Sequence, residues 1–474
     1  MGYRPSAYYS PIRGGTQSRR GLLYNLLSMP KKVVFIGSHL GYAMEKTPLG
    51  GGAMVGLQLI RHWAGLSGVE VVALGSGPVV PHSGVEYVQA PAGTGLPASL
   101  VNLSELGYAR FCRDFEKQTT RWLLERLDRF DPRSTAVVVN DISEGPDLKA
   151  LTAKGFPVVS LWHVDVVDYF NKLYLRNLVR PERLTSLYER TRRLGIHWIV
   201  PDVLQLVFEK QRQTVAHSRR MILPSRAMAE TVERCYGDIP SGGESFQKRA
   251  VVIPWGMWAE DLEESAVERG SQRLRGHYGI GPASRVVMTL SRIAPEKGIH
   301  LLLEALRLME TEPGFALGDL HLLLCGEPAF MKGASYMRKV KAAAAALRRV
   351  KVHFTGYLAP PEKAMHFRLA HLFVSPSIHE SYGLNIVEAM RAGLPILASD
   401  HYGVRDTVKP SFGVAVHYPS PAKAPALLAR GLKDLLADPR RLGLMGKEAK
   451  AAAAEMPFSE AAAKVMAAAT ELLK

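Results

Sequence analysis

Two glutamates, Glu380 and Glu388, lie eight positions apart in a stretch whose residue types suit a sugar nucleotide. A strand-like apolar run precedes them at 372–374 and a helical pattern follows from Leu384, so the glutamates flank a strand-to-helix turn that contains Gly383. The N–H groups and the positive dipole end of such a helix attract a phosphate. An ionised glutamate on either side accepts hydrogen bonds from sugar hydroxyls. The stretch therefore predicts a sugar-nucleotide site.

A second motif places two cations in the loop at 291–298, which follows an apolar run at 286–290 and opens a helix. Ligands of open α/β sheets bind at the carboxyl ends of strands. Arg292 and Lys297 therefore stand where two cations can neutralise a diphosphate. Alone, this loop could equally be an ordinary basic surface, and the glutamate stretch is what favours the diphosphate.

The N-terminal half also carries polar or glycine-rich loops after its strand-like runs. The glycines at 50–52 permit close backbone approach to a ligand, although their spacing differs from the dinucleotide fingerprint. His163 follows a strand, where it can hydrogen-bond a bound group or be a satisfied core histidine. Asn140 and Asp141 end another strand. We expect these two residues, together with Asp165, on the acceptor side of a site.

Strands and helices alternate twice along the chain, which indicates two Rossmann-like, doubly wound α/β domains that face each other across a cleft. The predicted strands are 32–37, 69–74, 136–139, 158–161 and 221–223, then 286–290, 320–325, 352–354, 372–375 and 395–399. Helices are predicted through Trp63 and over 301–309, 339–349 and 384–391, with a mostly helical, basic insertion at about 165–220. We place a basic N-terminal extension at 1–30, the domains at 31–256 and 257–456, and a final helix at 457–474.

The formal net charge of +16 is unevenly distributed. Residues 1–32 carry six Lys or Arg and no acid, and residues 165–220 carry eleven Lys or Arg against six Asp or Glu. These stretches suit an anionic membrane surface or a phosphorylated substrate, or are simply a solvated surface. Nucleic acid is disfavoured because no binding module is recognisable.

The remaining composition favours a cytoplasmic enzyme without metal. Three scattered cysteines lack metal-ligand spacing and indicate a reducing compartment. We find no apolar run near the roughly 20 residues that span a bilayer. There is no Asp-x-Asp triplet, zinc-spaced cluster or Walker-type loop, so we expect no metal and no cofactor.

These motifs resemble the retaining glycosyltransferases of family 4, which have the GT-B fold of two Rossmann domains. The resemblance runs from about Lys31 to the C-terminus and rests chiefly on the stretches 380–390 and 291–298. Weaker similarities are at 224–225, 253–256 and 354–357, and Trp255 stands where many family members carry Asn.

The resemblance implies a role for each matching residue. Arg292 and Lys297 would bind the donor diphosphate and stabilise the leaving group, and Glu380 would hold the donor sugar. Glu388 would accept from the ribose, and His163 would lie near the sugar and the acceptor. The other donor-side positions implied are Gly51, Gly52, Ser381, Tyr382, Gly383 and Leu384 around the phosphates and sugar, and Gly356, Tyr357 and Leu358 around the base. The final helix would cross back onto the first domain.

The implied reaction is retaining, metal-independent transfer of a hexosyl group from a UDP- or GDP-linked sugar to a hydroxyl acceptor. The leaving phosphate would take the proton of the acceptor. Two alternatives stay open. A sugar-nucleotide epimerase on the same fold would convert the donor with no acceptor present. A non-catalytic sugar-nucleotide binder, associated with a membrane through its basic stretches, would bind the donor without turnover.

Overall fold

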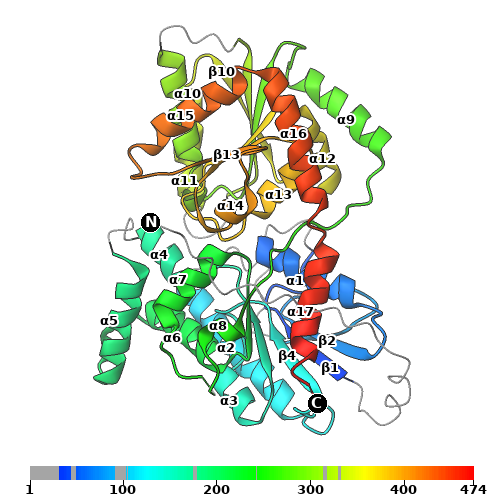
Figure 1. Cartoon of the computed structure of the whole chain (residues 1–474), viewed down its shortest axis with the longest axis vertical. Coiled ribbons are helices and arrows are strands. Elements are labelled where there is room, and N and C mark those ends of the chain that lie inside the picture. Colours follow the sequence, from blue (N-terminus) through cyan, green and yellow to red (C-terminus); the bar gives the residue numbers. More distant parts are fainter. Residues whose placement is uncertain are drawn as a thin grey trace.

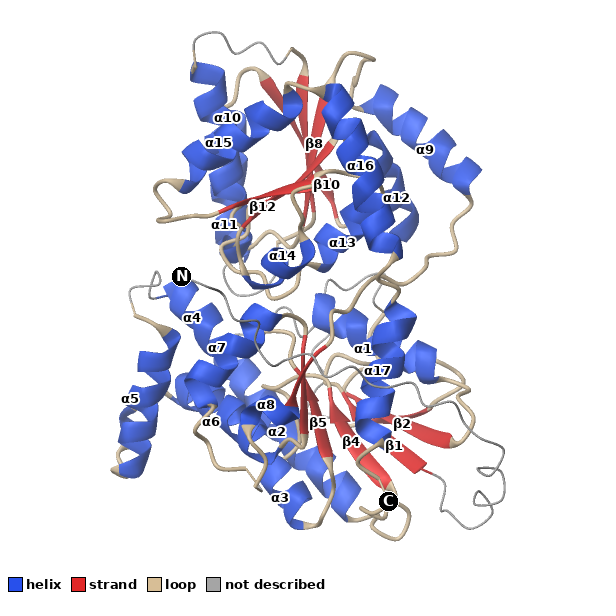
Figure 2. Ribbon diagram, viewed as in Figure 1, coloured by secondary structure: helices blue, strands red, loops and turns tan. Residues whose placement is uncertain are grey.

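The computed structural model describes residues 31–43, 50–90, 103, 105–174, 179–241, 243–312, 318–328 and 333–473. Two α/β domains, each built on one parallel sheet, are stacked along the long axis of the molecule (Figures 1 and 2). The predicted fold class is confirmed. The predicted extension at 1–30 lies outside the described residues.

The first domain contains a seven-stranded sheet in the order β3-β2-β1-β4-β5-β6-β7. Val33 and Phe35 face a core shared with α1 and α17, while Val34 and Ile36 face a core shared with α2 and α3. Because helices cover both faces, the central strands are apolar throughout. The strands are β1 (Lys31–Ile36), β2 (Val69–Gly75), β3 (Glu86–Gln89), β4 (Thr135–Val139), β5 (Val158–Leu161), β6 (Arg220–Leu223) and β7 (Ala250–Val252).

Helices connect these strands, and four of them lie in the basic insertion between β5 and β6. The helices of this domain are α1 (Gly51–Trp63), α2 (Glu105–Leu124), α3 (Leu148–Ala153), α4 (Val166–Tyr174), α5 (Pro181–Arg193), η3 (His197–Ile199), α6 (Asp202–His217), α7 (Arg226–Tyr236) and α8 (Phe246–Arg249).

The second domain repeats the layout around a six-stranded sheet in the order β10-β9-β8-β11-β12-β13. One face packs against α10, α11 and α15, and the other against α12, α13 and α16. The strands are β8 (Arg285–Leu290), β9 (Leu320–Cys325), β10 (Val350–Gly356), β11 (Leu372–Ser375), β12 (Ile396–Ser399) and β13 (Gly413–Val416). The helices are α9 (Glu264–His277), η4 (Pro295–Lys297), α10 (Ile299–Thr311), α11 (Gly333–Ala345), α12 (Pro360–Leu369), α13 (Leu384–Arg391), α14 (Tyr402–Thr407), α15 (Ala424–Leu436) and α16 (Pro439–Ala454). The predicted helix at 339–349 is wrong at both ends, since α11 begins at Gly333 and ends at Ala345.

The chain crosses between the domains twice, and the two crossings lie side by side. Met257 and Pro457 form an isolated parallel bridge. After the second crossing, α17 (Phe458–Thr470) packs on the first sheet and on α1, as the red helix in the lower part of Figure 1 shows. Its carbonyl at Ala462 accepts a hydrogen bond of 3.0 Å from the Trp63 indole.

Strand order reverses once in each sheet, between β1 and β4 in the first domain and between β8 and β11 in the second. In open parallel sheets this reversal leaves space for a ligand at the carboxyl ends of the strands. The loops after these four strands begin at Gly37, Asn140, Ser291 and Pro376. They carry most of the residues in the two sequence motifs.

Candidate active site

Lys297 and Glu380 form an ion pair that joins the loops after β8 and β11. The Lys297 Nζ donates to Glu380 Oε2 at 2.8 Å, and the two side chains are 14% and 12% exposed. Burial alone would raise the pKa of Glu380, but the charge and the hydrogen bond of Lys297 outweigh it and hold the pKa below its ordinary value. Glu380 is therefore an anion held by Lys297.

Arg292 extends from the same loop toward the first domain. A Cβ placed on Gly50 would lie 4.0 Å from Arg292 Cζ. Within its own domain, the Arg292 guanidinium lies 3.7 Å from the carboxylate of the buried Glu296. The backbone of Glu296 is held by the loop after β11, because Ile378 N donates to the Glu296 carbonyl at 2.7 Å. The guanidinium thus stands at the contact between the domains.

Two helix N-termini meet at the same contact, and neither has a side-chain cap. The α1 helix follows Gly50 and has no acid in its first turn, and α13 follows Gly383, which has a φ of 87°. A Cβ on Gly51 would lie 2.9 Å from Leu384 Cδ1, so the first turns of the two helices touch. Two positive dipole ends and two cations therefore converge, which suits a diphosphate.

The turn between Glu380 and α13 is also held by the first domain. The Ser225 hydroxyl donates to the Ser381 carbonyl at 3.2 Å, and the Tyr382 hydroxyl accepts from Gly256 N at 2.9 Å. Both side chains at 381 and 382 are buried. The backbone of this turn, rather than the Tyr382 side chain, is consequently what a ligand can contact.

Glu388 lies one turn into α13 and has a partner that the sequence did not reveal. Its carboxylate accepts from Lys363 of α12, and the same ammonium lies 3.3 Å from Glu260. Burial would lower the pKa of Lys363, but the charges of Glu388 and Glu260 outweigh it and raise the pKa. Glu380 and Glu388 thus belong to separate ion pairs, with Lys297 and with Lys363.

Gly356 is the last residue of β10, the edge strand of the second sheet, and Tyr357 and Leu358 follow it. The carbonyl of Gly356 accepts from Gly326 N at 2.8 Å, which ties this loop to the one after β9. Tyr357 is exposed, whereas the Leu358 side chain is buried in the core. A planar base would meet Tyr357 and the backbone here, not the side chain of Leu358.

His163 and Asn140 form one hydrogen-bonded unit beside α1. The Asn140 amide nitrogen donates to the Gly52 carbonyl and to Asp141, each at 3.2 Å, which leaves its oxygen to accept from His163 Nε2 at 3.1 Å. Burial lowers the pKa of His163, so its ring is neutral and its Nδ1 is an acceptor. The ring also occupies the space left by Gly52, where a Cβ would lie 2.9 Å from it.

Asp141 belongs to a charged group behind this unit. Its carboxylate lies 3.4 Å from His39 Nδ1, and this imidazole lowers the pKa of Asp141 against the effect of burial. Close by, burial and the charge of Asp141 raise the pKa of Glu144 to about 7, and Tyr108 donates a hydrogen bond to that carboxylate. The polar group around Asp141 therefore includes His39 from the loop after β1 and Glu144 from the loop after β4, which sequence reasoning missed.

The expectation for Asp165 needs a correction. Asp165 is fully buried and caps α4, where its Oδ1 accepts from the N–H groups of Val167 and Asp168 at 3.1 and 3.2 Å and from Gln211 at 3.0 Å. An aspartate just before a helix is a preferred N-cap. Its side chain supports the helix and is not available to an acceptor.

Asp168, one turn further along α4, does reach the second domain. It accepts a hydrogen bond from Tyr402, pairs with Lys172 at 2.7 Å and lies 3.4 Å from the buried ring of His379. Because His379 directly precedes Glu380, this contact helps to fix the loop that carries the ion pair.

The residues missed by sequence reasoning share one property. The partnerships of His39, Glu144, Lys363 and Asp168 join segments far apart in the chain. Only His39 carried a sequence signal, since it closely follows β1. In the described part of the chain, no group of three His, Cys, Asp or Glu is placed to hold a metal ion.

Comparison with known families accords with this arrangement. Residues 271–452 match the sequence model of the family "glycosyl transferases group 1". The second domain is a group 1 glycosyltransferase domain. The matched residues include Arg292, Lys297, Glu380 and Glu388.

Relatives of this glycosyltransferase domain are found among characterised proteins. The chain is 30% identical over 275 residues to a D-inositol 3-phosphate glycosyltransferase of Segniliparus rotundus, covering 56% of this chain and 55% of that protein. It is 27% identical over 179 residues to an alpha-monoglucosyldiacylglycerol synthase of Streptococcus pneumoniae, covering 37% and 38%. The chain thus spans only about a third to a half of the length of these relatives.

Solved structures of other proteins match both domains. The sucrose-phosphate synthase of Thermosynechococcus elongatus aligns with a TM-score of 0.65 and 18% identity over 92% of this chain and 97% of that one. HepE of Anabaena in complex with UDP-glucose aligns with a TM-score of 0.59 and 16% identity over 92% and 98%. At these identities the likeness establishes the shared two-domain fold.

Proposed function

We propose that this protein is a retaining hexosyltransferase that uses a nucleoside diphosphate sugar and a hydroxyl acceptor. The observation that carries the proposal is the convergence of Arg292, Lys297 and the N-termini of α1 and α13 at the contact between the domains. A diphosphate bound there meets two cations and two helix dipoles. The group 1 match of residues 271–452 supports the same function.

In this proposal, the donor lies across the turn at 381–384. Arg292 and Lys297 neutralise the diphosphate, and the backbone N–H groups of the turn contact phosphate and sugar. Glu380 accepts from sugar hydroxyls while Lys297 holds its charge. Glu388 accepts from the ribose, and the base lies beside Tyr357. The complex of HepE with UDP-glucose supports a uridine donor, and a guanosine donor is the alternative.

The acceptor lies on the first domain, near His163, Asn140 and Asp141. The relatives are named for inositol 3-phosphate and for a glucosyldiacylglycerol, so they do not narrow the acceptor beyond a hydroxyl compound. The neutral His163 donates through Nε2 to Asn140, and its Nδ1 can accept from a sugar or acceptor hydroxyl.

The proposed reaction breaks the bond between the anomeric carbon and the β-phosphate oxygen. The acceptor oxygen bonds to the same face of that carbon, and its proton passes to the departing phosphate oxygen, so configuration is retained. Negative charge grows on the leaving diphosphate, which Arg292, Lys297 and the two helix ends stabilise in place of a metal ion. Preorganised charges of this kind usually make the largest single contribution to lowering the activation barrier.

A ligand panel followed by a turnover assay tests the proposal. At a concentration of about 100 times Kd, a donor stabilises the folded chain by about 2.7 kcal/mol, which raises Tm by several degrees. We expect one UDP- or GDP-linked hexose to raise the Tm of the wild type and of Lys433→Met, a control that removes another ion-paired lysine of the same domain. The same donor should raise the Tm of Lys297→Met much less.

Turnover then separates the remaining possibilities. A transferase releases nucleoside diphosphate faster when a hydroxyl acceptor is added, and NMR of the product reports the anomeric configuration. Conversion of the donor sugar without an acceptor would indicate an epimerase, and binding without turnover would indicate a non-catalytic binder. A panel in which no sugar nucleotide raises Tm would contradict the proposal.

A further inference from the structure

Large apolar side chains are exposed together on and next to α5 and η3. The α5 helix lies at the left edge of the lower domain in Figures 1 and 2. Leu194 is 72% exposed and Trp198 is 71% exposed. Most other exposed large apolar side chains among the described residues are spread over both domains, as scattered ones usually are. The apolar members of this group are Leu187, Leu194, Ile196, Trp198 and Ile199.

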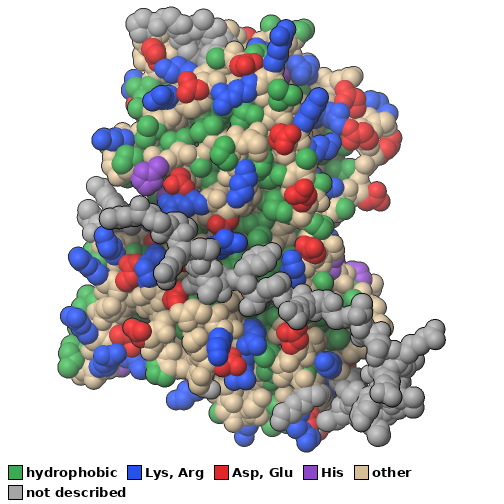
Figure 3. Space-filling view, in the orientation of Figure 1, with side chains coloured by type: hydrophobic (Ala, Val, Ile, Leu, Met, Phe, Trp, Pro, Cys, Tyr) green, Lys and Arg blue, Asp and Glu red, His purple; other side chains and the backbone are tan. Residues whose placement is uncertain are grey.

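Basic side chains are interleaved with these apolar ones. Arg180, Arg183, Arg190 and Arg193 are exposed, and none of them forms an ion pair among the described residues. Along α5, positions 183, 187, 190 and 194 recur at helical spacing and so lie on one side. We call these four arginines and five apolar residues the α5–η3 face. Figure 3 shows basic and apolar side chains along this edge of the molecule, with a few acidic ones beside them.

The acids of the segment point into the protein instead. Glu182 pairs with Arg234 of α7 at 2.6 Å, and Glu189 pairs with Arg212 of α6 at 3.0 Å. The fully exposed residues of α5 are therefore arginines, Leu187 and one neutral serine, Ser186, with no acid among them, although the sequence of the helix contains both signs of charge.

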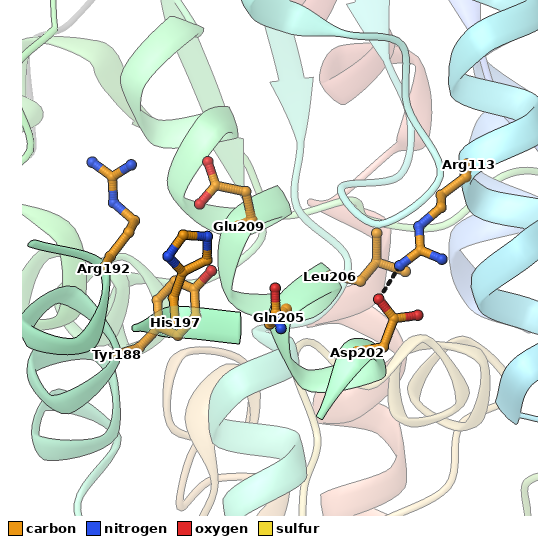
Figure 4. A pocket seen from close by; sticks show the side chains of 8 residues that line it. All are labelled: Arg113, Tyr188, Arg192, His197, Asp202, Gln205, Leu206 and Glu209. Carbon is orange, nitrogen blue, oxygen red and sulfur yellow. Dashed lines mark hydrogen bonds and ion pairs between the residues drawn. The ribbon is translucent and has the colours of Figure 1, made fainter. Parts of the chain in front are cut away.

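The pocket beside this face has a different character. It has a volume of about 310 Å³ and lies between α2, α5, η3 and α6 (Figure 4). Arg113 and Arg192 line it together with Asp202 and Glu209, and Arg113 pairs with Asp202. Its charges are balanced, so the attraction for anions belongs to the exposed face and not to the pocket.

We propose that the α5–η3 face binds the surface of an anionic lipid bilayer. The arginines would contact lipid phosphates, while Trp198, Ile199 and Leu194 enter the boundary between headgroups and acyl chains. Tryptophan favours that boundary because its ring is apolar and its N–H is polar. The contact proposed here is a peripheral one. Among the described residues, no helix is long and apolar enough to span a bilayer.

Charge argues against the other occupants of such a face. In a two-fold dimer the same patch meets itself, which would set arginines against arginines without an exposed acid between them. Nucleic acid would pair with the arginines but would leave Leu194, Trp198 and Ile199 against a polar, hydrated backbone. An anionic bilayer satisfies both kinds of side chain at once.

The face is connected to the candidate active site through the fold. The α4 helix packs against α5 and also against η4, which carries Lys297. A bilayer bound at α5 would therefore lie next to α4, the helix that also contacts the candidate active site. The inference itself does not depend on glycosyl transfer, because lipid binding is measured without a donor.

Vesicle flotation of the full chain tests the proposal. We expect the wild type to float with vesicles of phosphatidylcholine mixed with phosphatidylglycerol, much less with phosphatidylcholine alone, and less as salt rises. Arg190→Glu with Arg193→Glu should lower partitioning at least about tenfold. Trp198→Ser with Ile199→Ser should lower it about tenfold by removing apolar burial.

Two matched controls lie on α16 of the other domain. Arg440→Glu with Arg441→Glu makes the same change in net charge at exposed positions, and Leu444→Ser replaces an apolar side chain that is 64% exposed. Both should float like the wild type, and all variants should keep the wild-type Tm because the replaced side chains are exposed.

Three results would overturn the proposal. The first is a wild type that does not float with anionic vesicles at low salt. The second is an equal loss of flotation in the α16 variants and the α5–η3 variants. The third is a dimer in sedimentation that Trp198→Ser with Ile199→Ser converts to a monomer, which would assign the face to a second copy of the chain.

Discussion

Replacing Lys297 with methionine separates its role in folding from its proposed role in catalysis. The replacement leaves Glu380 charged and largely buried, since its Oε2 loses the Nζ donor at 2.8 Å. Breaking a fully buried pair costs about 3–5 kcal/mol. The side chains here are 14% and 12% exposed, so water screens part of that cost, and we expect a loss of about 2–3 kcal/mol in the free energy of unfolding.

The expected effect on transfer is larger than the effect on folding. Loss of one preorganised charge at the developing anion typically lowers kcat by about 10²–10³, or about 2.7–4 kcal/mol. We expect Lys297→Met to lower kcat/KM by about 10³-fold with the donor that the ligand panel identifies. Initial rates of nucleoside diphosphate release and urea unfolding of the same samples measure the two effects.

The double variant Lys297→Met with Glu380→Gln is the decisive measurement. Glutamine removes the unpaired charge, so stability should return to within about 1 kcal/mol of the wild type. Transfer should stay low, because the cation that faces the diphosphate is still absent. Recovery of transfer along with stability would refute the reasoning and reduce Lys297 to a structural partner. Lys433→Met, which breaks an exposed pair with Glu312, should cost under about 1 kcal/mol and leave the rate unchanged.

Three further variants test neighbouring parts of the site. Gly52→Ala places a Cβ 2.9 Å from the His163 ring and should lower transfer at least about tenfold. The control Gly276→Ala in α9, where no atom lies within 4 Å of the added Cβ, should leave transfer unchanged. A wild-type rate in Gly52→Ala would refute the packing argument. Burial and the charge of Asp141 raise the pKa of Glu144 from 4.5 to about 7, so the folded chain binds more protons than the unfolded chain in this window and stability falls as pH rises through it. Glu144→Gln should therefore gain about 3 kcal/mol relative to the wild type between about pH 5 and pH 8, and a Tm difference that does not change with pH would contradict the shift. Lys363→Met should raise the donor KM about tenfold with kcat nearly unchanged, because Lys363 positions Glu388, and Glu388 would bind the ribose rather than the bond that breaks. An equal fall in kcat and kcat/KM would contradict this assignment.

The interior of each sheet could be predicted from the sequence, and parts of the edges could not. The strands β5, β9 and β11 were predicted to the residue, because buried parallel strands are continuous apolar runs. The three strands that were missed, β3, β7 and β13, all lie at the edges of the sheets. They are short and partly exposed, so their apolar signal is weak. The α11 helix was displaced because its Ala-rich sequence has no strong end signal.

The residues of the candidate site divide in a similar way, into those that one stretch of sequence predicts and those that depend on contacts between distant segments. Glu380, Gly383 and the α13 boundary could be read from one stretch, because a strand, a glycine turn and a helix follow each other directly. Asp165 was misassigned because a helix N-cap and a ligand both favour aspartate at a loop end. Lys363 could not be predicted as the partner of Glu388, since only the packing of α12 near α13 brings them together.

The pairing of the carboxylates around the contact bears on the mechanism. A carboxylate that attacks the anomeric carbon must be aimed at that carbon, and the four acids described around the contact are each oriented by ion-pair or hydrogen-bond partners. Lys297 holds Glu380, Lys363 holds Glu388, and Asp141 lies between His39 and Asn140. Asp168 accepts from Tyr402 and pairs with Lys172. The cations and helix ends are instead gathered where a leaving diphosphate would carry its charge, so the arrangement favours same-face attack with the phosphate as base over a covalent glycosyl-enzyme. Trapping with a slow fluorinated donor analogue would separate the two, since a stable mass increase on Glu380 or Asp168 would require the covalent route.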